Sequence, residues 1–171
     1  MIDLADEIGK KALEVVALEW RKQGHELSGE AVRNMATVSL PFATGIRIEG
    51  YVPDYMAYLN AGIPANRIPY SPGSGKPFSL YIQGLKEYAK KRMGKSDKEA
   101  LGVAFAIASK HKREGMPTRA SARYSQTGKR TGFIETALQD AIPDFEKIIL
   151  DSVGAEFNAV ITTYFKSVLN R

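Results

Sequence analysis

The sequence predicts an α+β fold, in which a small antiparallel sheet built on one β-hairpin is flanked by several α-helices. Apolar residues recur at about 3.6-residue spacing near both ends of the chain, which is typical of long amphipathic helices. Over residues 38–49 the period changes to two around a central turn, as in a hairpin. The 171 residues are 44% apolar and 25% charged, which is ordinary globular composition. We therefore expect one domain over residues 1–171.

The chain opens with a long helix predicted over residues 2–23, which Gly24 ends. A short helix over residues 27–35 follows, with Ser28 as its expected N-cap. The alternating apolar residues of the predicted hairpin are Val38, Leu40, Phe42, Ile46 and Ile48. Pro41 has no N–H to donate to the ladder, so its strand should lie at a sheet edge or carry a bulge.

Residues 51–75 hold four tyrosines and four prolines but no long apolar run. This segment should therefore form a defined surface structure rather than part of the hydrophobic core. Pro53 predicts a helix start and Gly62 its end. The later prolines stiffen a loop that is well suited to contact another molecule, although a packed surface loop is the alternative.

Two helices are predicted next, one from Ser79 to Met93 and one that begins at the capping box of Ser96 and Glu99 and stops at Gly115. These, with the hairpin, complete an α+β core over residues 27–142.

Residues 116–132 are polar and basic, with almost nothing to bury, and a loop of this length is usually functional or mobile. Helix resumes over residues 133–141, and Pro143 kinks or restarts it. The C-terminal helical segment covers residues 143–170. Gly154 interrupts its apolar series, and the β-branched residues 160–163 leave a strand as an alternative there.

Charge is unevenly distributed. The net charge is +5, yet residues 61–132 hold 15 Lys and Arg against 4 Asp and Glu, whereas residues 1–60 hold 6 against 9 and residues 133–171 hold 3 against 6. A basic block between acidic flanks indicates contact with nucleic acid or complementary contact between copies of the protein. Solvated lysines on helix surfaces are the plain alternative.

The sequence does not predict an enzyme, a metal site or a cofactor. There are no cysteines, and neither His25 nor His111 has a metal-ligand companion at helical spacing. The better interpretation of His111 is a residue at a core edge or a helix end. Gly73-Ser74-Gly75 followed by Lys76 lacks the spacing of a phosphate loop. With an acidic N-terminus and no apolar run of 18 residues, we expect a soluble protein that is made in a cytoplasm and does not bind membrane.

The order of segments over residues 27–138 resembles the tail-completion family of tailed bacteriophages. The similar segments are L-S-G-E-A-V-R-N-M, the hairpin, Y-M-A-Y-L-N-A-G, Y-I-Q-G-L-K-E-Y-A-K-K, A-F-A-I-A-S-K-H-K-R-E-G-M-P-T and F-I-E-T-A-L. The family's step from aromatic residues to glycine matches Tyr55, Tyr58, Leu59 and Gly62 here, while Asn60 stands where an acidic residue is usual.

This resemblance implies a structural virion protein that forms a homo-oligomeric ring in the neck or tail, as a head-to-tail connector or tail-completion ring. Its partners would be copies of itself, neighbouring neck, tail or connector proteins, and DNA that passes through the ring without sequence-specific binding. A basic nucleic-acid-binding protein is the alternative.

A head-to-tail ring needs two different faces on each copy, and the segregated charge agrees with that need. We expect basic residues of one copy to meet an acidic flank of the next, with tyrosines as anchors. The candidate interface residues are Tyr58, Arg67, Tyr70, Lys90, Lys91, Arg92, Arg119, Arg123 and Tyr124.

Overall fold

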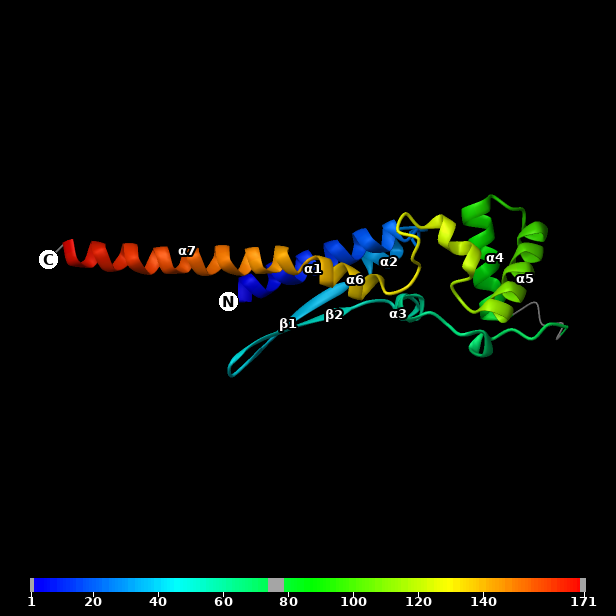
Figure 1. The fold of residues 1–171 in the computed structure, drawn as a ribbon, viewed down its shortest axis with the longest axis horizontal. Coiled ribbons are helices and arrows are strands. Elements are labelled where there is room, and N and C mark those ends of the chain that lie inside the picture. Colours follow the sequence, from blue (N-terminus) through cyan, green and yellow to red (C-terminus); the bar gives the residue numbers. More distant parts are fainter. Residues whose placement is uncertain (1, 74–78, 170–171) are drawn as a thin grey trace. The chain divides into compact units, whose positions relative to one another are not determined.

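The computed structural model describes residues 2–73 and 79–169, with side chains at residues 3–73 and 79–163, and it confirms the α+β class (Figure 1). Residues 74–76 of the segment compared above with a phosphate loop lie outside the described residues. The elements are the helices and strands α1 (Ile2–Lys22), α2 (Glu30–Arg33), β1 (Ala36–Phe42), β2 (Gly45–Tyr51), α3 (Asp54–Ala61), the 3-10 helix η1 (Ala65–Arg67), α4 (Leu80–Met93), α5 (Asp97–Glu114), the 3-10 helix η2 (Arg119–Tyr124), α6 (Phe133–Asp140) and α7 (Ile142–Leu169).

The chain divides into two compact units, each folded from segments that are far apart in the sequence. Unit 1 comprises the described residues of Met1–Glu19, Met35–Tyr51 and Ile134–Arg171, and unit 2 comprises those of Trp20–Asn34 and Val52–Phe133. Two helices contribute to both units, because the boundaries fall within α1 and at the first residue of α6. The structure thus describes two compact units, and the single domain stays a prediction.

In unit 1, the hairpin packs against α1 at Gly9. A Cβ atom added at Gly9 would lie 2.8 Å from Oγ1 of Thr37 and 3.6 Å from Cγ2 of Ile48, so only glycine allows this approach. Nearby, the Ser39 hydroxyl donates a 2.8 Å hydrogen bond to Asp6 Oδ1. The side of β1 that faces α1 is therefore its polar side.

The hairpin itself agrees with the sequence prediction. The two strands pair without a bulge from Ala36 opposite Tyr51 to Phe42 opposite Gly45. In the described part of the chain the sheet has only these two strands, so both are edge strands and the expectation for Pro41 is confirmed.

Unit 2 is built around the α4–α5 pair. Ile82, Ala104 and Ala108 are buried at its centre, and half-buried aromatic and leucine side chains pack around them. The predicted starts of both helices are confirmed. The Ser79 hydroxyl accepts a 3.2 Å hydrogen bond from the Ile82 amide, and Glu99 accepts one of 3.1 Å from the Ser96 amide.

One expectation about local structure is wrong. The N-cap of α2 is Gly29 in the left-handed conformation, not Ser28, and no side chain caps this short helix. Of the two alternatives for residues 160–163, helix is the one observed, since α7 continues through Gly154 to Leu169. The 116–132 loop contains η2, and the Gln126 amide donates to the Lys22 carbonyl at 2.8 Å.

Gly24, which ends α1 as expected, also fixes this loop. Its φ is +73°, and an added Cβ would lie 2.1 Å from the Tyr124 carbonyl oxygen. Gly94 ends α4 at a similar φ of +61°, but an added Cβ there would meet nothing within 4 Å. Substitutions at these two glycines therefore distinguish the cost of backbone strain alone from the cost of strain plus a steric clash.

We expect Gly94→Ala to lower the free energy of unfolding by about 1–2 kcal/mol, the cost of the left-handed backbone alone. Gly24→Ala should cost about 1–3 kcal/mol more, because the new methyl group displaces the Tyr124 backbone. Urea unfolding measures both costs. Limited proteolysis at Arg123 and Lys129 should accelerate only in the Gly24 variant, and equal effects of the two substitutions would contradict this account.

Candidate assembly surfaces

The outer face of the hairpin carries exposed apolar side chains from β1 and an exposed tyrosine from β2. Residues that are directly opposite in the ladder share a face, so Val38, Leu40 and Phe42 lie on the same side as Tyr51. These four side chains, the hairpin face, are 44%, 41%, 56% and 52% exposed, respectively. An antiparallel sheet with one covered side normally turns its apolar residues inward. Here β1 turns its polar side to α1 and its apolar side to solvent, whereas β2 does the reverse, with Ile46 and Ile48 on the α1 side.

Two charged residues of β2, Arg47 and Glu49, lie on the same side of the sheet as the hairpin face. Arg47 lies opposite Leu40, and its guanidinium is 3.6 Å from the Glu49 carboxylate. The Tyr51 hydroxyl donates a 3.0 Å hydrogen bond to the same carboxylate. The Arg47 side chain is still 70% exposed, so its charge remains accessible to another molecule.

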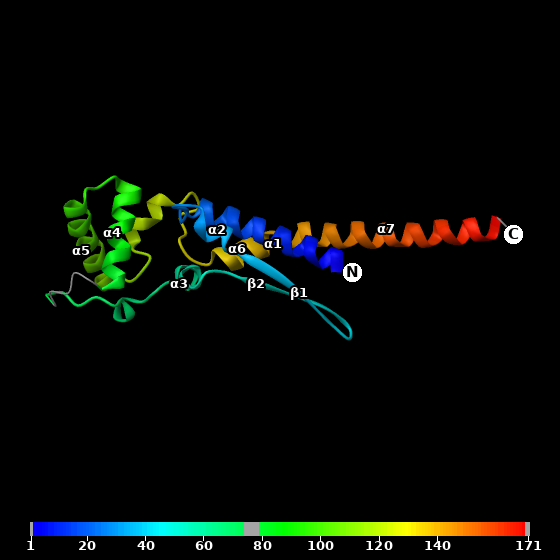
Figure 2. The same ribbon diagram turned by 180° about the vertical axis from the view of Figure 1, so that it is seen from behind.

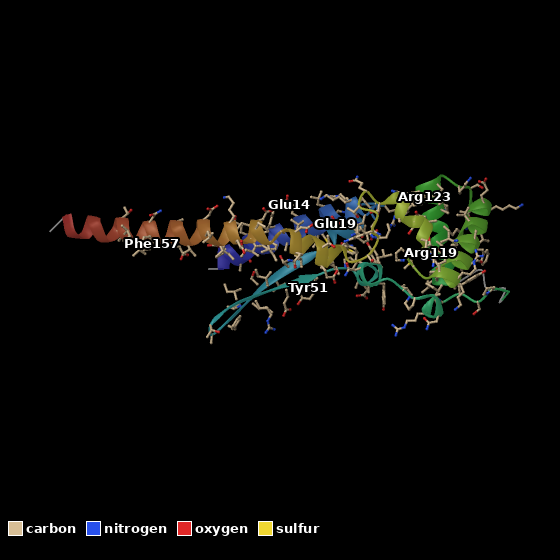
Figure 3. All side chains as sticks on the ribbon, in the orientation of Figure 1. Glu14, Glu19, Tyr51, Arg119, Arg123 and Phe157 are labelled. Atoms are coloured by element: carbon tan, nitrogen blue, oxygen red, sulfur yellow. The ribbon has the colours of Figure 1, made fainter. Side chains whose placement is uncertain are left out.

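The second exposed apolar surface runs along α7. Its first turn is held within unit 1, since Ala141 just before it is buried and Asp144 forms a 3.0 Å ion pair with Lys11 of α1. Further along, five apolar side chains recur at helical spacing and remain between 38% and 70% exposed. This α7 stripe consists of Leu150, Val153, Phe157, Val160 and Ile161. Figure 2 shows this half of α7 without another element of unit 1 beside it, and Figure 3 labels Phe157 on it.

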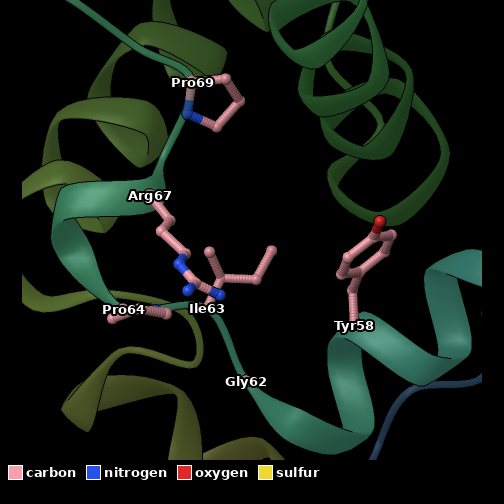
Figure 4. Close-up of a pocket in the computed structure, with 6 residues that line it drawn as sticks. All are labelled: Tyr58, Gly62, Ile63, Pro64, Arg67 and Pro69. Carbon is pink, nitrogen blue, oxygen red and sulfur yellow. The ribbon is translucent and has the colours of Figure 1, made fainter.

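Two of the predicted interface residues, Tyr58 and Arg67, line one open pocket of about 310 Å³ in unit 2 (Figure 4). Tyr58 projects from α3 and is 62% exposed, while Arg67 ends η1 and is exposed. The other lining residues are Gly62, Ile63, Pro64 and Pro69. The proline loop thus contributes one predicted interface residue, Arg67, to the exposed surface.

Tyr70 lies elsewhere, in the packed centre of unit 2. It packs against the Ile82, Ala104 and Ala108 cluster, and its ring centroid is 6.3 Å from that of Phe105. The Ser109 hydroxyl also approaches its hydroxyl group, at 3.4 Å. These contacts indicate that Tyr70 holds its own loop against α4 and α5.

The basic helix surface of α4 is partly engaged within the chain. Lys90 forms ion pairs of 3.0 Å with Asp97 and 3.3 Å with Glu87, and these carboxylates raise the pKa of Lys90. Arg92 donates a 3.1 Å hydrogen bond to the Glu26 carbonyl. Lys91 is exposed between them. Of the three predicted contact residues, only Lys91 points to solvent with no partner among the described residues.

The other predicted residues lie on η2. Arg119 and Arg123 are exposed, and the Arg123 guanidinium lies 4.8 Å from the ring centroid of Tyr124. One of its nitrogens donates a 2.7 Å hydrogen bond to the Tyr124 hydroxyl. Tyr124 is 54% exposed, so this cation and ring form one exposed pair.

Each histidine packs against an aromatic side chain of unit 2. His111 lies in the last turn of α5, half-buried as expected, with Nδ1 2.7 Å from the Tyr81 hydroxyl. His25 stacks on Trp20 at 4.6 Å and lies 5.5 Å from the Phe133 ring. Burial, together with the nearby positive charge of Arg130, lowers the pKa of His25 to about 4.

A pH dependence of stability follows from His25. Its pKa is about 4 in the folded chain and 6.5 without that environment, so the unfolded chain binds the proton first as the pH falls. The unfolding temperature should therefore decrease between about pH 6.5 and pH 4. His25→Gln should reduce this decrease but not remove it, because burial also lowers the pKa of His111. Thermal unfolding at half-unit pH steps would show it, and an unchanged slope in the variant would exclude His25 as the cause.

Comparison with family models, curated proteins and solved structures found no significant match to this chain. Among the described residues, no group of three or more His, Asp and Glu side chains could hold a metal ion. None of the helices in the described part of the chain has the length and hydropathy that crossing a bilayer requires.

Proposed function

We propose that this protein is a structural subunit that assembles with copies of itself into a ring, as a connector or tail-completion component in the neck or tail of a tailed bacteriophage. The virion location comes from the resemblance over residues 27–138. Self-assembly has support from the geometry of unit 1.

The observation that carries the proposal is the presence of two different apolar surfaces on one unit. The hairpin face and the α7 stripe together expose nine apolar or aromatic side chains, each at least 38% accessible. Soluble monomers rarely expose contiguous apolar surface of this kind unless it binds something. Two unlike surfaces on each copy also meet the requirement of a head-to-tail contact.

Binding of nucleic acid, the second candidate, has support from the basic block alone. Part of that charge is already matched within the chain, since Lys86 and Lys90 pair with Asp97, and Lys110 pairs with Glu114. Lys112 donates to the Ile68 carbonyl at 3.2 Å. These contacts leave fewer cations for phosphates than the sequence count indicates.

Assembly should be visible in the mass of the purified protein. At increasing concentration, light scattering should show multiples of 18.8 kDa, alone or with virion extract. Phe157→Glu should raise the dissociation constant by roughly 10–100-fold, because it places a charge in an apolar contact. Ala155→Glu is the matched control, since Ala155 is exposed on the opposite side of α7. A wild-type protein that stays monomeric under all these conditions would refute the proposal.

For DNA we expect weak, unselective binding that moderate salt abolishes. If the basic loop did bind duplex phosphates, replacing Arg119 and Arg123 by alanine should flatten the log–log salt slope by about 0.9 for each phosphate that is no longer neutralised. Fluorescence anisotropy with a labelled duplex, at several salt concentrations, measures both quantities. Tight binding at physiological salt with such a flattened slope would favour the nucleic-acid candidate.

A further inference from the structure

We propose that the α7 stripe of one copy packs on the hairpin face of the next copy, and that this contact repeats from subunit to subunit. The inference rests on the proposed self-assembly and specifies its interface. It replaces the basic surface of α4 as the principal contact, because Lys90 and Arg92 are engaged within their own chain.

A single kind of contact between copies covers both exposed surfaces. Within the described residues, α1 takes the polar side of β1, while the hairpin face and the α7 stripe of the same chain both stay exposed. If two α7 stripes paired with each other in a symmetric dimer, each hairpin face would remain exposed. Packing a stripe on a neighbour's hairpin face leaves only the ends of an open chain uncovered, and a ring has no ends.

The two surfaces also match in length. From Leu150 to Ile161, the stripe extends about 17 Å at the helical rise of roughly 1.5 Å per residue. The hairpin face, from the Ala36–Tyr51 pair to Phe42, extends about 20 Å at roughly 3.4 Å per residue. One helix lying along a two-stranded sheet therefore contacts the whole face.

The middle of each surface carries a charge of opposite sign. Glu156 is exposed beside Phe157 and forms no ion pair with any side chain that the structure describes. Arg47 lies opposite Leu40, at the middle of the hairpin face, and despite its 3.6 Å ion pair with Glu49 its side chain is 70% exposed, compared with 37% for Lys90. When Phe157 packs near Leu40, Glu156 and Arg47 become neighbours. Their attraction would set register and direction more than affinity.

Cross-linking tests this contact directly, because the chain has no native cysteine. Leu40→Cys and Phe157→Cys are made in separate preparations, mixed, and treated with a short bis-maleimide. We expect a cross-linked dimer that contains one chain of each kind, identified by a tag on one of them, and little product from either preparation alone. Replacing Phe157→Cys by Ala155→Cys, on the far side of α7, should abolish the product.

Each result has a definite meaning. If Phe157→Cys alone cross-links efficiently and the mixture adds nothing, α7 pairs with α7 and the proposed contact is wrong, although self-assembly remains. If wild-type mass shows multimers but no hairpin–α7 product forms, the contact is likewise wrong. If the wild type never exceeds 18.8 kDa, the proposed function itself fails.

A charge exchange provides a second readout that does not depend on cysteine geometry. Arg47→Glu should weaken assembly by about tenfold, and adding Glu156→Arg should restore most of the loss, while circular dichroism of the monomer stays unchanged. A double variant that assembles no better than Arg47→Glu alone would contradict the pairing.

Discussion

The close packing of α1 on the hairpin determines what unit 1 can do. Gly9 brings the helix against Thr37 and Ile48, and Asp6 accepts a hydrogen bond from Ser39. These contacts commit the polar side of β1 to the interior of the unit. Because side chains alternate along a strand, the same contacts turn the apolar side outward. The exposed hairpin face is thus a direct consequence of one glycine and one hydrogen bond, and the proposed assembly depends on both.

In unit 2, the comparable role belongs to the end of α1. Trp20 and His25 stack there and contact Phe133, while the Lys22 carbonyl accepts the Gln126 amide. The long basic loop is therefore fixed to a helix end about 100 residues earlier in the sequence. Its exposed pair of Arg123 and Tyr124 is presented from a defined backbone rather than from a free loop.

Much of this fold could be predicted from local signals. The helix starts at Ser79 and Ser96, the stops at Gly24 and Gly94, and the alternation of the hairpin are each set by neighbouring residues, so the sequence reveals them. The candidate surfaces could not be predicted in the same way. Alternation shows that a strand has an apolar side but not which way that side faces, since this depends on Gly9, 28 residues before Thr37. Similarly, the apolar series of α7 indicates a buried helix until the structure shows that nothing in the described part of the unit covers it. Tyr70 and Lys90 are interface candidates from residue type alone. The sequence does not reveal that each has partners elsewhere in its own chain, which Tyr70 finds in α4 and α5 and Lys90 finds in Asp97.

Pro41 has a consequence for the chain before it assembles. Hydrogen-bonded and non-hydrogen-bonded pairs alternate in an antiparallel ladder, and the two-residue turn is closed by Phe42 and Gly45, so Pro41 and Ile46 form a non-hydrogen-bonded pair. The N–H that proline lacks would have pointed to the open edge of β1. A free subunit with an exposed apolar face and a complete strand edge could recruit further strands into a fibre. The missing donor interrupts that edge. The free subunit can therefore bind another copy through the side chains of its hairpin face, but its strand edge is a poor template for amyloid-like growth.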